Sequence, residues 1–356
     1  MKIAVLPGDG IGPEVTSQAI KALQAIADIY GHTFTFTEGL IGAAAIEATG
    51  NPFPQATEEL CKAADAILFG AIGDPRYDND PAAKVRPEQG LLKMRQELGL
   101  FGNIRPVTTY ESLAGMSPLK NEVIKGVDFV VFRELTGGIY FGEPRGRSEN
   151  GDKAYDTCVY ARYEVERIAR LAFEAAGKRS GRLTLVDKAN VLATSRLWRE
   201  TVTGMAGDYP QVTLDFMFVD NAAMKIIQNP AGFDVVVTEN MFGDILTDEA
   251  SVISGSLGLL PSASVGNHVS LFEPIHGSYP QVAGQNKANP VGAILSAAML
   301  LDYAFNMTKE AKVIKEAVTS AINQGYVTED LNPANPIGTS EAGDKVVDII
   351  KTAALV

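Results

Sequence analysis

The chain has 356 residues, of which 46% are hydrophobic and 21% are charged, and its formal net charge at pH 7 is −12. This composition is typical of a globular protein with a large core and excludes disordered and fibrous classes. A negative overall field repels nucleic acids and anionic membranes, so neither is expected as a partner. An anionic small-molecule ligand would need positive charge gathered locally at its binding site.

The cysteine and histidine content limits the compartment and the metal chemistry. Two cysteines, Cys61 and Cys158, cannot form a disulfide framework in so long a chain, so we expect reduced thiols and a cytoplasmic protein. We expect no secretory signal, and the most apolar run, 293–301, is shorter than the roughly 20 residues of a membrane-spanning helix. With three histidines in all, a histidine-rich zinc site is not expected.

Short apolar runs alternate with longer amphipathic stretches, which predicts an α/β protein. The predicted strands, in chain order, are 2–6, 66–69, 127–132, 183–186, 214–219 and 234–238. Helical patterns begin near Pro13 and recur over 88–98, 163–176 and 291–305. The alternating segment 154–160 has no evident core partner, and we expect it to form an arm used between subunits.

A glycine-rich turn follows the first predicted strand. Gly8, Gly10 and Gly12 have the spacing G-x-G-x-G, whereas the dinucleotide fingerprint is G-x-G-x-x-G. The turn could bind a phosphate at the N-terminus of the following helix, or it could be a tight turn without a ligand. The motif alone leaves both interpretations open.

Polar residues follow three of the predicted strands. They include Lys188 after the first of these strands, Asp220 after the second, and Glu239 and Asn240 after the third. Ligand sites in open α/β sheets lie at the carboxyl ends of strands, so these residues are expected to share one site. The alternative is that each acid is a helix N-cap, where Asp is common.

Asp244 and Asp248 are four residues apart, which places both carboxylates on one face of a predicted helix. Like charges at this spacing destabilise a helix, so a compensating charge is expected. A divalent cation such as Mg²⁺ would supply it, with Asp220 as a third ligand. A solvated acidic helix face is the alternative.

Three arginines could supply the positive charge that an anionic ligand needs: Arg95, Arg105 and Arg133. A guanidinium group binds a carboxylate through two parallel hydrogen bonds. The helical period places Glu88, Leu91 and Leu92 on the same face as Arg95. The two leucines would suit a carboxylate ligand with an apolar branch. For Arg95, a surface helix charge is the alternative.

Tyr140 follows a pair of glycines, Gly137 and Gly138, after the strand that ends near Arg133. The glycines would let the ring reach the edge of a site, where its hydroxyl could act as a general acid. A tyrosine buried in the core is the alternative.

Five segments together carry a family resemblance: LPGDGIGPEV, FRELTGGIYFGEPRG, VDKANVL, the run from Asn240 to Gly258, and FEPIHGS. With them the chain resembles the isocitrate/3-isopropylmalate dehydrogenase family from residue 1 to about residue 305. The resemblance implies that family's α/β two-domain fold with a large mixed β-sheet, which is not a Rossmann fold. It also implies a large cofactor-binding domain, 1–100 plus 254–356, and a second domain, 101–253, with the dimer interface and the arm.

The activity implied by the resemblance is oxidative decarboxylation of 3-isopropylmalate to 2-oxoisocaproate and CO₂ in leucine biosynthesis, with NAD and a divalent metal. Isocitrate-specific members carry a serine-rich helix where this chain has Leu91 and Leu92, which would seat an isopropyl group. Oxidation of D-malate, tartrate or homoisocitrate is an alternative within the family. A non-catalytic regulatory subunit is a further one, but it predicts lost acid–base or metal residues, and here all are present.

The resemblance further implies roles for single residues. The substrate-binding residues would be Arg95, Arg105, Arg133, Asp220, Glu88, Leu91 and Leu92. Tyr140 and Lys188 would be the acid–base residues, and Asp220, Asp244 and Asp248 would bind Mg²⁺ or Mn²⁺. Members of the family are homodimers, and Lys188 and Asp220 would act in the site of the neighbouring subunit.

The cofactor-binding residues implied are Ile11, Glu88, His276, Gly277, Ser278, Gln281, Ala288 and Asn289. Gln281 departs from the pattern, since NAD-dependent relatives often carry an Asp there for the adenosine ribose. Glutamine can still hydrogen-bond a ribose hydroxyl, and the Lys and Tyr typical of NADP users are absent. We therefore expect NAD, with weaker discrimination against NADP than an aspartate would give.

Overall fold

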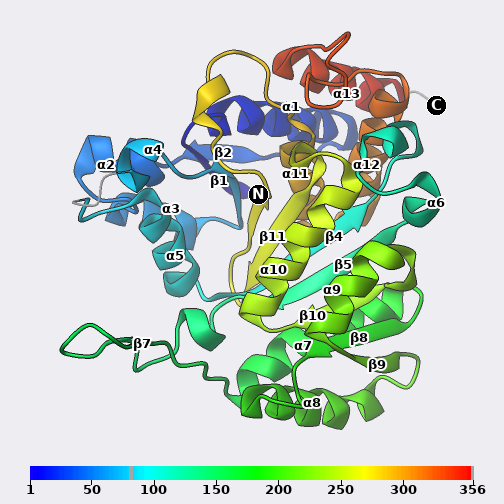
Figure 1. Ribbon diagram of the computed structural model, residues 1–356. Helices are drawn as coiled ribbons and strands as arrows, with labels where there is room; N and C mark the ends of the chain where they lie inside the picture. Colours follow the sequence, from blue (N-terminus) through cyan, green and yellow to red (C-terminus); the bar gives the residue numbers. More distant parts are fainter. Residues whose placement is uncertain (80–82, 354–356) are drawn as a thin grey trace. The chain divides into compact units, whose positions relative to one another are not determined.

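The computed structural model describes residues 1–79 and 83–353 (Figure 1). The chain divides into two compact units, Met1–Leu100 with Gly255–Val356, and Phe101–Ser254. Each unit has a set of five hydrogen-bonded strands of mixed direction with helices beside them, and the second unit has in addition a two-stranded hairpin. The expected α/β fold class with a large mixed β-sheet is confirmed. None of the helices in the described part of the chain combines the length and the apolar character that crossing a bilayer requires.

The strands are β1 (Lys2–Gly8), β2 (Thr35–Glu38), β3 (Ala66–Ala71), β4 (Leu100–Thr108), β5 (Asp128–Glu134), β6 (Gly146–Arg147), β7 (Ala154–Tyr155), β8 (Arg182–Asp187), β9 (Thr213–Phe218), β10 (Val235–Thr238), β11 (Pro261–Gly266) and β12 (Leu271–Pro274). The α-helices are α1 (Gly12–Tyr30), α2 (Gly42–Thr49), α3 (Gln55–Ala63), α4 (Pro75–Asp78), α5 (Pro87–Glu97), α6 (Asn121–Ile124), α7 (Arg162–Lys178), α8 (Ala193–Met205), α9 (Val219–Gln228), α10 (Asn240–Ser251), α11 (Val291–Phe305), α12 (Thr308–Asn323) and α13 (Thr339–Ala353).

In the first unit the strand order is β2-β1-β3-β12-β11. The first four strands are parallel, and β11 runs antiparallel to β12. All six residues of β3 are buried, as expected for a parallel strand covered on both faces. Apolar side chains of β1 and β3 share a core cluster with Met94 of α5. The antiparallel strand distinguishes this sheet from the all-parallel Rossmann order.

In the second unit the strand order is β4-β5-β10-β8-β9, and only β4 is antiparallel to its neighbour. Helices α9 and α10 lie on one face of these strands, and α7 and α8 lie on the other (Figure 1). The register places Arg133 at the end of β5 beside Thr238 at the end of β10. Because parallel strands end at one edge of the sheet, Arg133 lies close to the residues that begin α10.

The structure contains strands that the sequence patterns did not predict: β2, β4, β11 and β12. The most consequential is β4, which carries Arg105. It contains Gly102 and Pro106, residue types that are depleted in strands and so obscured the pattern. The predicted strand 214–219 is confirmed with a shift of one residue as β9, and Asp220 follows it in the first turn of α9.

The expected arm over 154–160 is shorter than predicted. Only β7 is extended, and it pairs with β6 in a hairpin that reaches away from the helices of the second unit (Figure 1). Tyr160 belongs to the core instead, because its side chain is buried and its hydroxyl donates to Glu239 and accepts from the backbone N–H of Asn240. The use of the hairpin between subunits stays a prediction.

The glycine-rich turn after β1 packs closely against other backbone. Gly10 has φ +57°, and a Cβ on it would lie 2.0 Å from the carbonyl oxygen of Ser278. The N–H of Ile11 donates to that same oxygen at 2.8 Å. The carboxylate of Asp9 accepts hydrogen bonds from the N–H groups of Ala43 and Gly73, at 3.0 and 2.9 Å. These contacts favour the interpretation of a tight turn whose polar groups bind the protein itself.

Candidate functional site

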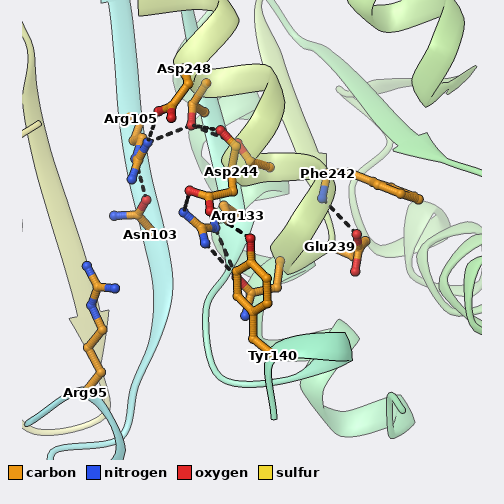
Figure 2. Close-up of polar contacts among 12 residues, drawn as sticks. Arg95, Asn103, Arg105, Arg133, Tyr140, Glu239, Phe242, Asp244 and Asp248 are labelled. Atoms are coloured by element: carbon orange, nitrogen blue, oxygen red, sulfur yellow. Dashed lines mark hydrogen bonds and ion pairs between the residues drawn. The ribbon is translucent and has the colours of Figure 1, made fainter. Parts of the chain in front are cut away.

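A cluster of charged and polar side chains lies where β4, β5 and the start of α10 meet in the second unit (Figure 2). Arg105 and Asn103 share one face of β4, two residues apart, and Asn103 pairs with Arg133 in the register of β4 and β5. The Nε of Arg105 donates to Asn103 Oδ1 at 2.7 Å. The strands thus bring both arginines to the side on which α10 carries its aspartates.

Both arginines contact the aspartates of α10. Arg133 is buried, and its Nη1 lies 2.5 Å from Oδ1 of Asp244. Arg105 donates to the hydroxyl of Thr247 at 2.7 Å and lies 3.3 Å from Oδ1 of Asp248. The compensating positive charge that the aspartate pair requires is therefore supplied, within the chain, by two guanidinium groups. The Asp248 side chain remains mostly exposed.

Tyr140 completes this cluster, with 40% of its surface exposed and its hydroxyl donating to Asp244 Oδ2 at 2.9 Å (Figure 2). Burial, together with the hydrogen bond to Asp244, raises the pKa of the Tyr140 hydroxyl above its ordinary value. Gly138 has φ +73°, and a Cβ on it would lie 2.4 Å from the Tyr160 hydroxyl. The glycine is thus needed for close packing against Tyr160. The alternative that Tyr140 is a core tyrosine is wrong.

Lys188 and Asp220 form a second polar group in the same unit. Lys188 Nζ lies 2.6 Å from Asp220 Oδ1, and this hydrogen bond lowers the pKa of the Asp220 carboxyl. The residue before Lys188 is anchored, since Asp187 binds Arg199 through two hydrogen bonds of 2.8 Å each. Over residues 1–79 and 83–353, no three His, Cys, Asp or Glu side chains gather as metal ligands. Asp220 therefore does not join Asp244 and Asp248 as a third ligand within one chain.

In the first unit, the expected substrate residue Arg95 is partly buried and paired with an acid. Its Nη2 donates to Oε1 of Glu273 at 3.2 Å. Its Nε is buried and has no acceptor among the described residues, so one donor is unused. On the same helix, Leu91 packs against the core cluster, whereas Leu92 is 45% exposed.

Several of the expected cofactor residues lie near one another in the first unit. Ser278 accepts from the N–H of Ile11, as described above. A Cβ on Gly73 would lie 3.0 Å from Oε1 of Glu88 and 3.6 Å from Oγ of Ser278. Ile11, Glu88 and Ser278 therefore surround the glycine-lined segment that follows β3.

The remaining expected cofactor residues lie between β12 and α11. Burial lowers the pKa of His276, whose Nε2 has no hydrogen-bond partner among the described residues. The carbonyl oxygen of Gly277 accepts a hydrogen bond from Nδ1 of this ring at 2.9 Å. Asn289 donates to Asp330 at 3.0 Å, and the carbonyl oxygen of Ala288 accepts from Thr339. Gln281 is exposed.

The sequence patterns placed Asn240 among the residues expected to share the site but did not predict its contact with Arg133, and they gave no role to Asn103 or Glu273, which contact Arg105 and Arg95. Asn103 would have been found had β4 been predicted, since it lies two residues before Arg105 on the same strand face. Asn240 follows a predicted strand, but its contact with Arg133 depends on the strand register. For Glu273, no local pattern could have indicated the pairing with Arg95, which is distant in sequence.

Comparison with known proteins agrees with this arrangement. The family profile "Isocitrate/isopropylmalate dehydrogenase" matches residues 2–346. The chain is 55% identical over 354 residues to the 3-isopropylmalate dehydrogenase of Bacteroides fragilis, covering 99% of both chains. It is 56% identical over 353 residues to that of Priestia megaterium, covering 98% of this chain and 94% of the relative. Among solved structures, it is similar to isocitrate dehydrogenase from Methylococcus capsulatus, with TM-score 0.86, 33% identity and coverage of 98% and 99%. The chain therefore belongs to the isocitrate/isopropylmalate dehydrogenase family.

Proposed function

We propose that this chain oxidises and decarboxylates 3-isopropylmalate to 2-oxoisocaproate and CO₂, reducing NAD⁺, as a step of leucine biosynthesis. Relatives that match nearly the whole chain carry the name 3-isopropylmalate dehydrogenase. The observation that carries the proposal is the cluster in which Arg133, Asp244 and Tyr140 contact one another. In this cluster Arg133 would bind a substrate carboxylate, Asp244 would bind the metal, and Tyr140 would donate a proton. These are the three groups that the reaction requires.

The arginines supply the positive charge for a substrate with two carboxylates. Arg105 and Arg133 belong to the cluster on β4, β5 and α10, and Arg95 keeps a buried Nε donor without an acceptor among the described residues. A buried hydrogen-bond donor without an acceptor raises the free energy of the folded protein, and a substrate carboxylate oxygen that accepts from Arg95 Nε would remove this penalty. Leu92, exposed on the same helix as Arg95, would contact the isopropyl group together with Leu91.

The aspartates of α10 suit Mg²⁺ or Mn²⁺. Such ions prefer carboxylate oxygens and are usually held by one or two carboxylates, with substrate and water completing the shell. Asp244 and Asp248 offer two carboxylates on one helix face, and a third would come from Asp220 of a neighbouring subunit. When bound, the metal would polarise the substrate's oxygen atoms and stabilise negative charge during decarboxylation.

Three side chains would move the protons. Lys188 would pass a proton to Asp220, its partner at 2.6 Å, and so take the proton of the C2 hydroxyl by relay as hydride leaves C2 for the nicotinamide. The bond between C3 and its carboxylate then breaks, CO₂ leaves, and the electron pair of that bond stays behind as an enolate of C2 and C3. The Tyr140 hydroxyl would give its proton to C3. Its raised pKa keeps this hydroxyl protonated at neutral pH, as a proton donor requires.

The first unit suits a nicotinamide dinucleotide, and we propose NAD. His276 presents a buried Nε2 without a partner among the described residues, which a ligand polar group would satisfy. Ile11, Glu88 and Ser278 lie near the glycine-lined segment after β3 and would contact the cofactor with Gly277, Ala288 and Asn289. Gln281 is exposed and carries no charge to repel or attract a 2′-phosphate. The ratio of kcat/KM for NAD⁺ to that for NADP⁺ tests this part, and a ratio below one would contradict it.

We also propose that the active form is a homodimer. Lys188 and Asp220 pair with each other, and the described part of the chain assembles no three-acid metal cluster, so a site with Asp220 needs a second copy. Exposed apolar side chains on α9 and α10 support a subunit contact there: Met224 is 53% exposed and Ile245 is 59% exposed. Ile245 lies between the two proposed metal ligands, so this contact would bring a neighbour's residues near them.

A substrate panel tests the proposed reaction. The purified protein would be assayed with NAD⁺ and Mn²⁺ on 3-isopropylmalate, D-malate, tartrate, isocitrate and homoisocitrate. We expect the highest kcat/KM for 3-isopropylmalate, by about tenfold or more, because each well-placed apolar group contributes about 1–3 kcal/mol of discrimination. A preference for D-malate would contradict the role of the two leucines, and no turnover of any substrate would contradict the enzyme assignment.

A further inference from the structure

Asn240 is fully buried at the first position of α10, and its amide contacts two parts of the candidate site. Oδ1 accepts hydrogen bonds from Nε and Nη2 of Arg133, at 3.1 and 2.8 Å. Nδ2 donates to the carbonyl oxygen of Gly137 at 3.1 Å. One side chain therefore links a proposed substrate-binding arginine to the loop that leads to Tyr140.

The same loop is held on its other side by Glu134. This buried carboxylate at the end of β5 accepts from the N–H of Gly137 at 2.7 Å and from that of Thr136 at 3.1 Å. It also pairs with Arg167 of α7 at 2.9 Å. With its N–H bound by Glu134 and its carbonyl bound by Asn240, Gly137 is fixed at both ends. The next three residues form a short helical turn (Gly138–Tyr140), which presents the Tyr140 hydroxyl to Asp244.

An asparagine meets both needs of this position. Arg133 requires an acceptor on its Nε and Nη2 edge, and the Gly137 carbonyl requires a donor. An aspartate of the same size keeps the acceptor and loses the donor. Because Asn240 occupies the Nε and Nη2 edge of Arg133, Nη1 points to Asp244, whose second oxygen accepts from Tyr140 (Figure 2).

We propose that Asn240 is a positioning residue, which sets the guanidinium of Arg133 and the hydroxyl of Tyr140 relative to each other. The inference rests on the proposed function, because it takes Arg133 as a substrate ligand and Tyr140 as the proton donor. Asn240 acts through these two residues. Its loss should therefore alter substrate binding and the final proton transfer separately, according to which of the two contacts is removed.

The variant Asn240→Asp removes the hydrogen bond to the Gly137 carbonyl and also adds a negative charge beside Arg133. Asn103→Asp controls for that charge, since it adds the same charge beside Arg105. Arg133 keeps its acceptor, so any rise in KM for 3-isopropylmalate should reflect the added charge alone and should be similar in Asn103→Asp. The loop that carries Tyr140 loses its anchor, and a displacement of about 1 Å at a reacting group lowers turnover by up to about a hundredfold. We expect kcat to fall by about tenfold to a hundredfold.

A double-mutant cycle with Tyr140→Phe separates positioning from general damage. If Asn240 acts through the Tyr140 hydroxyl, Asn240→Asp should lower kcat by less than about twofold when that hydroxyl is already absent. An equal fold-loss in both backgrounds would overturn the proposal. Asn103→Asp is the matched comparison, since Asn103 is also buried and binds an arginine, and its effect should be the same in both backgrounds.

Asn240→Ser is the second variant and keeps the proposal testable if Asn240→Asp does not fold, as judged by its thermal unfolding. It shortens the side chain out of reach of both partners, so KM should rise and kcat should fall together. A change in only one of them would overturn the proposal. Wild-type protein that does not turn over 3-isopropylmalate would contradict the proposed function, whereas wild-type turnover with an additive cycle would contradict only the role of Asn240.

Discussion

The two units carry their candidate residues in different ways. In the second unit, Arg133, Asp244 and Tyr140 meet through direct side-chain contacts. In the first unit, Ile11 meets Ser278 through the backbone, and glycines such as Gly10 permit the close approach. The candidate residues of the second unit therefore meet through their functional groups, whereas those around Gly10 in the first unit meet through the backbone. Substitutions in the second unit should then mainly lower kcat, whereas substitutions in the glycine-rich turn of the first unit should mainly raise KM for NAD⁺.

The charges at the candidate site differ from the net charge of the whole chain. The chain as a whole carries −12, yet the cluster of the second unit pairs two arginines with two aspartates. A further arginine in the first unit, Arg95, retains a buried donor without an acceptor in the described part of the chain. The net charge of the whole chain therefore does not describe the candidate site, where arginines and carboxylates balance one another locally.

The largest effect is expected for Tyr140→Phe in the second unit. Removing a general acid typically costs about 10² to 10⁴ in rate, so kcat should fall by that factor while KM for 3-isopropylmalate changes little. Steady-state kinetics measure both values. Tyr163→Phe is the control, since Tyr163 is an exposed tyrosine on α7 outside the cluster and should leave kcat unchanged. Undiminished turnover of Tyr140→Phe would refute its role as proton donor.

Leu92→Ser probes substrate choice in the first unit. Losing one apolar contact to the isopropyl group should lower kcat/KM for 3-isopropylmalate by about tenfold or more and leave that for D-malate unchanged. Because Leu92 is exposed, the core should be unaffected. Leu40→Ser, another exposed leucine of that unit, is the matched control. Equal losses on both substrates would contradict the proposed contact.

Gly10→Ala probes the backbone surface directly. Its Cβ would lie 2.0 Å from the Ser278 carbonyl oxygen, so the turn must shift, and KM for NAD⁺ should rise by about tenfold, which corresponds to about 1.4 kcal/mol. The positive φ alone costs alanine about 1–2 kcal/mol of stability. Gly31→Ala separates the two effects, since Gly31 has φ +73° with nothing within 4 Å. It should lose stability without a change in KM; a normal KM in Gly10→Ala would show that the turn does not shape the cofactor site.

The smallest effect is expected from an acid that holds the fold and belongs to neither cluster. Asp234 accepts hydrogen bonds from Arg179 at 2.7 Å and from the N–H of Ser180 at 3.1 Å. Although burial alone would raise its pKa, the hydrogen bonds from Ser180 and Arg179 hold the pKa of this carboxyl below its ordinary value. Asp234→Asn should lower the free energy of unfolding by about 1–3 kcal/mol at pH 7, without changing kcat.

The difference in free energy of unfolding between wild type and Asp234→Asn should depend on pH, and the pKa of Asp234 gives its direction. A depressed pKa in the folded state stabilises the protein above the unfolded-state value of about 3.9, and the stabilisation is lost as the pH falls through the folded-state pKa. Urea unfolding at pH 7 and below pH 4 should show that the free energies of unfolding of wild type and Asp234→Asn become more similar on acidification. A gap that widens would contradict the assignment.

Much of this molecule could be predicted from its sequence, because the apolar parallel strands and the polar residues at their ends follow simple patterns. The predicted strands near 2–6, 66–69, 127–132, 183–186, 214–219 and 234–238 are confirmed with small shifts at their ends. The spacing of Asp244 and Asp248 gave their common helix face. β4 was missed because Gly102 and Pro106 interrupt its pattern.

The sequence patterns could not predict contacts that depend on strand register or that join distant segments of the chain. The pairing of Arg133 with Thr238 determines that Asn240 reaches the guanidinium group, and no local spacing encodes this register. The pairing of Arg95 with Glu273 likewise joins residues far apart in the chain. The patterns also indicated a cation beside Asp244 and Asp248 as the compensating charge, whereas the chain itself places Arg133 and Arg105 there.

The most direct test of the central claim is complementation between two inactive variants, Lys188→Ala and Tyr140→Phe. If each site takes Tyr140 from one subunit and Lys188 from the other, a mixed dimer has one site with both defects and one site intact. Unfolding and refolding the two variants together, in equal amounts, should then restore about a quarter of the wild-type rate of 3-isopropylmalate oxidation, since about half of the dimers are mixed. Activity no higher than that of the separate variants would contradict a shared site, and with it the account of how Tyr140 and Lys188 act on one substrate.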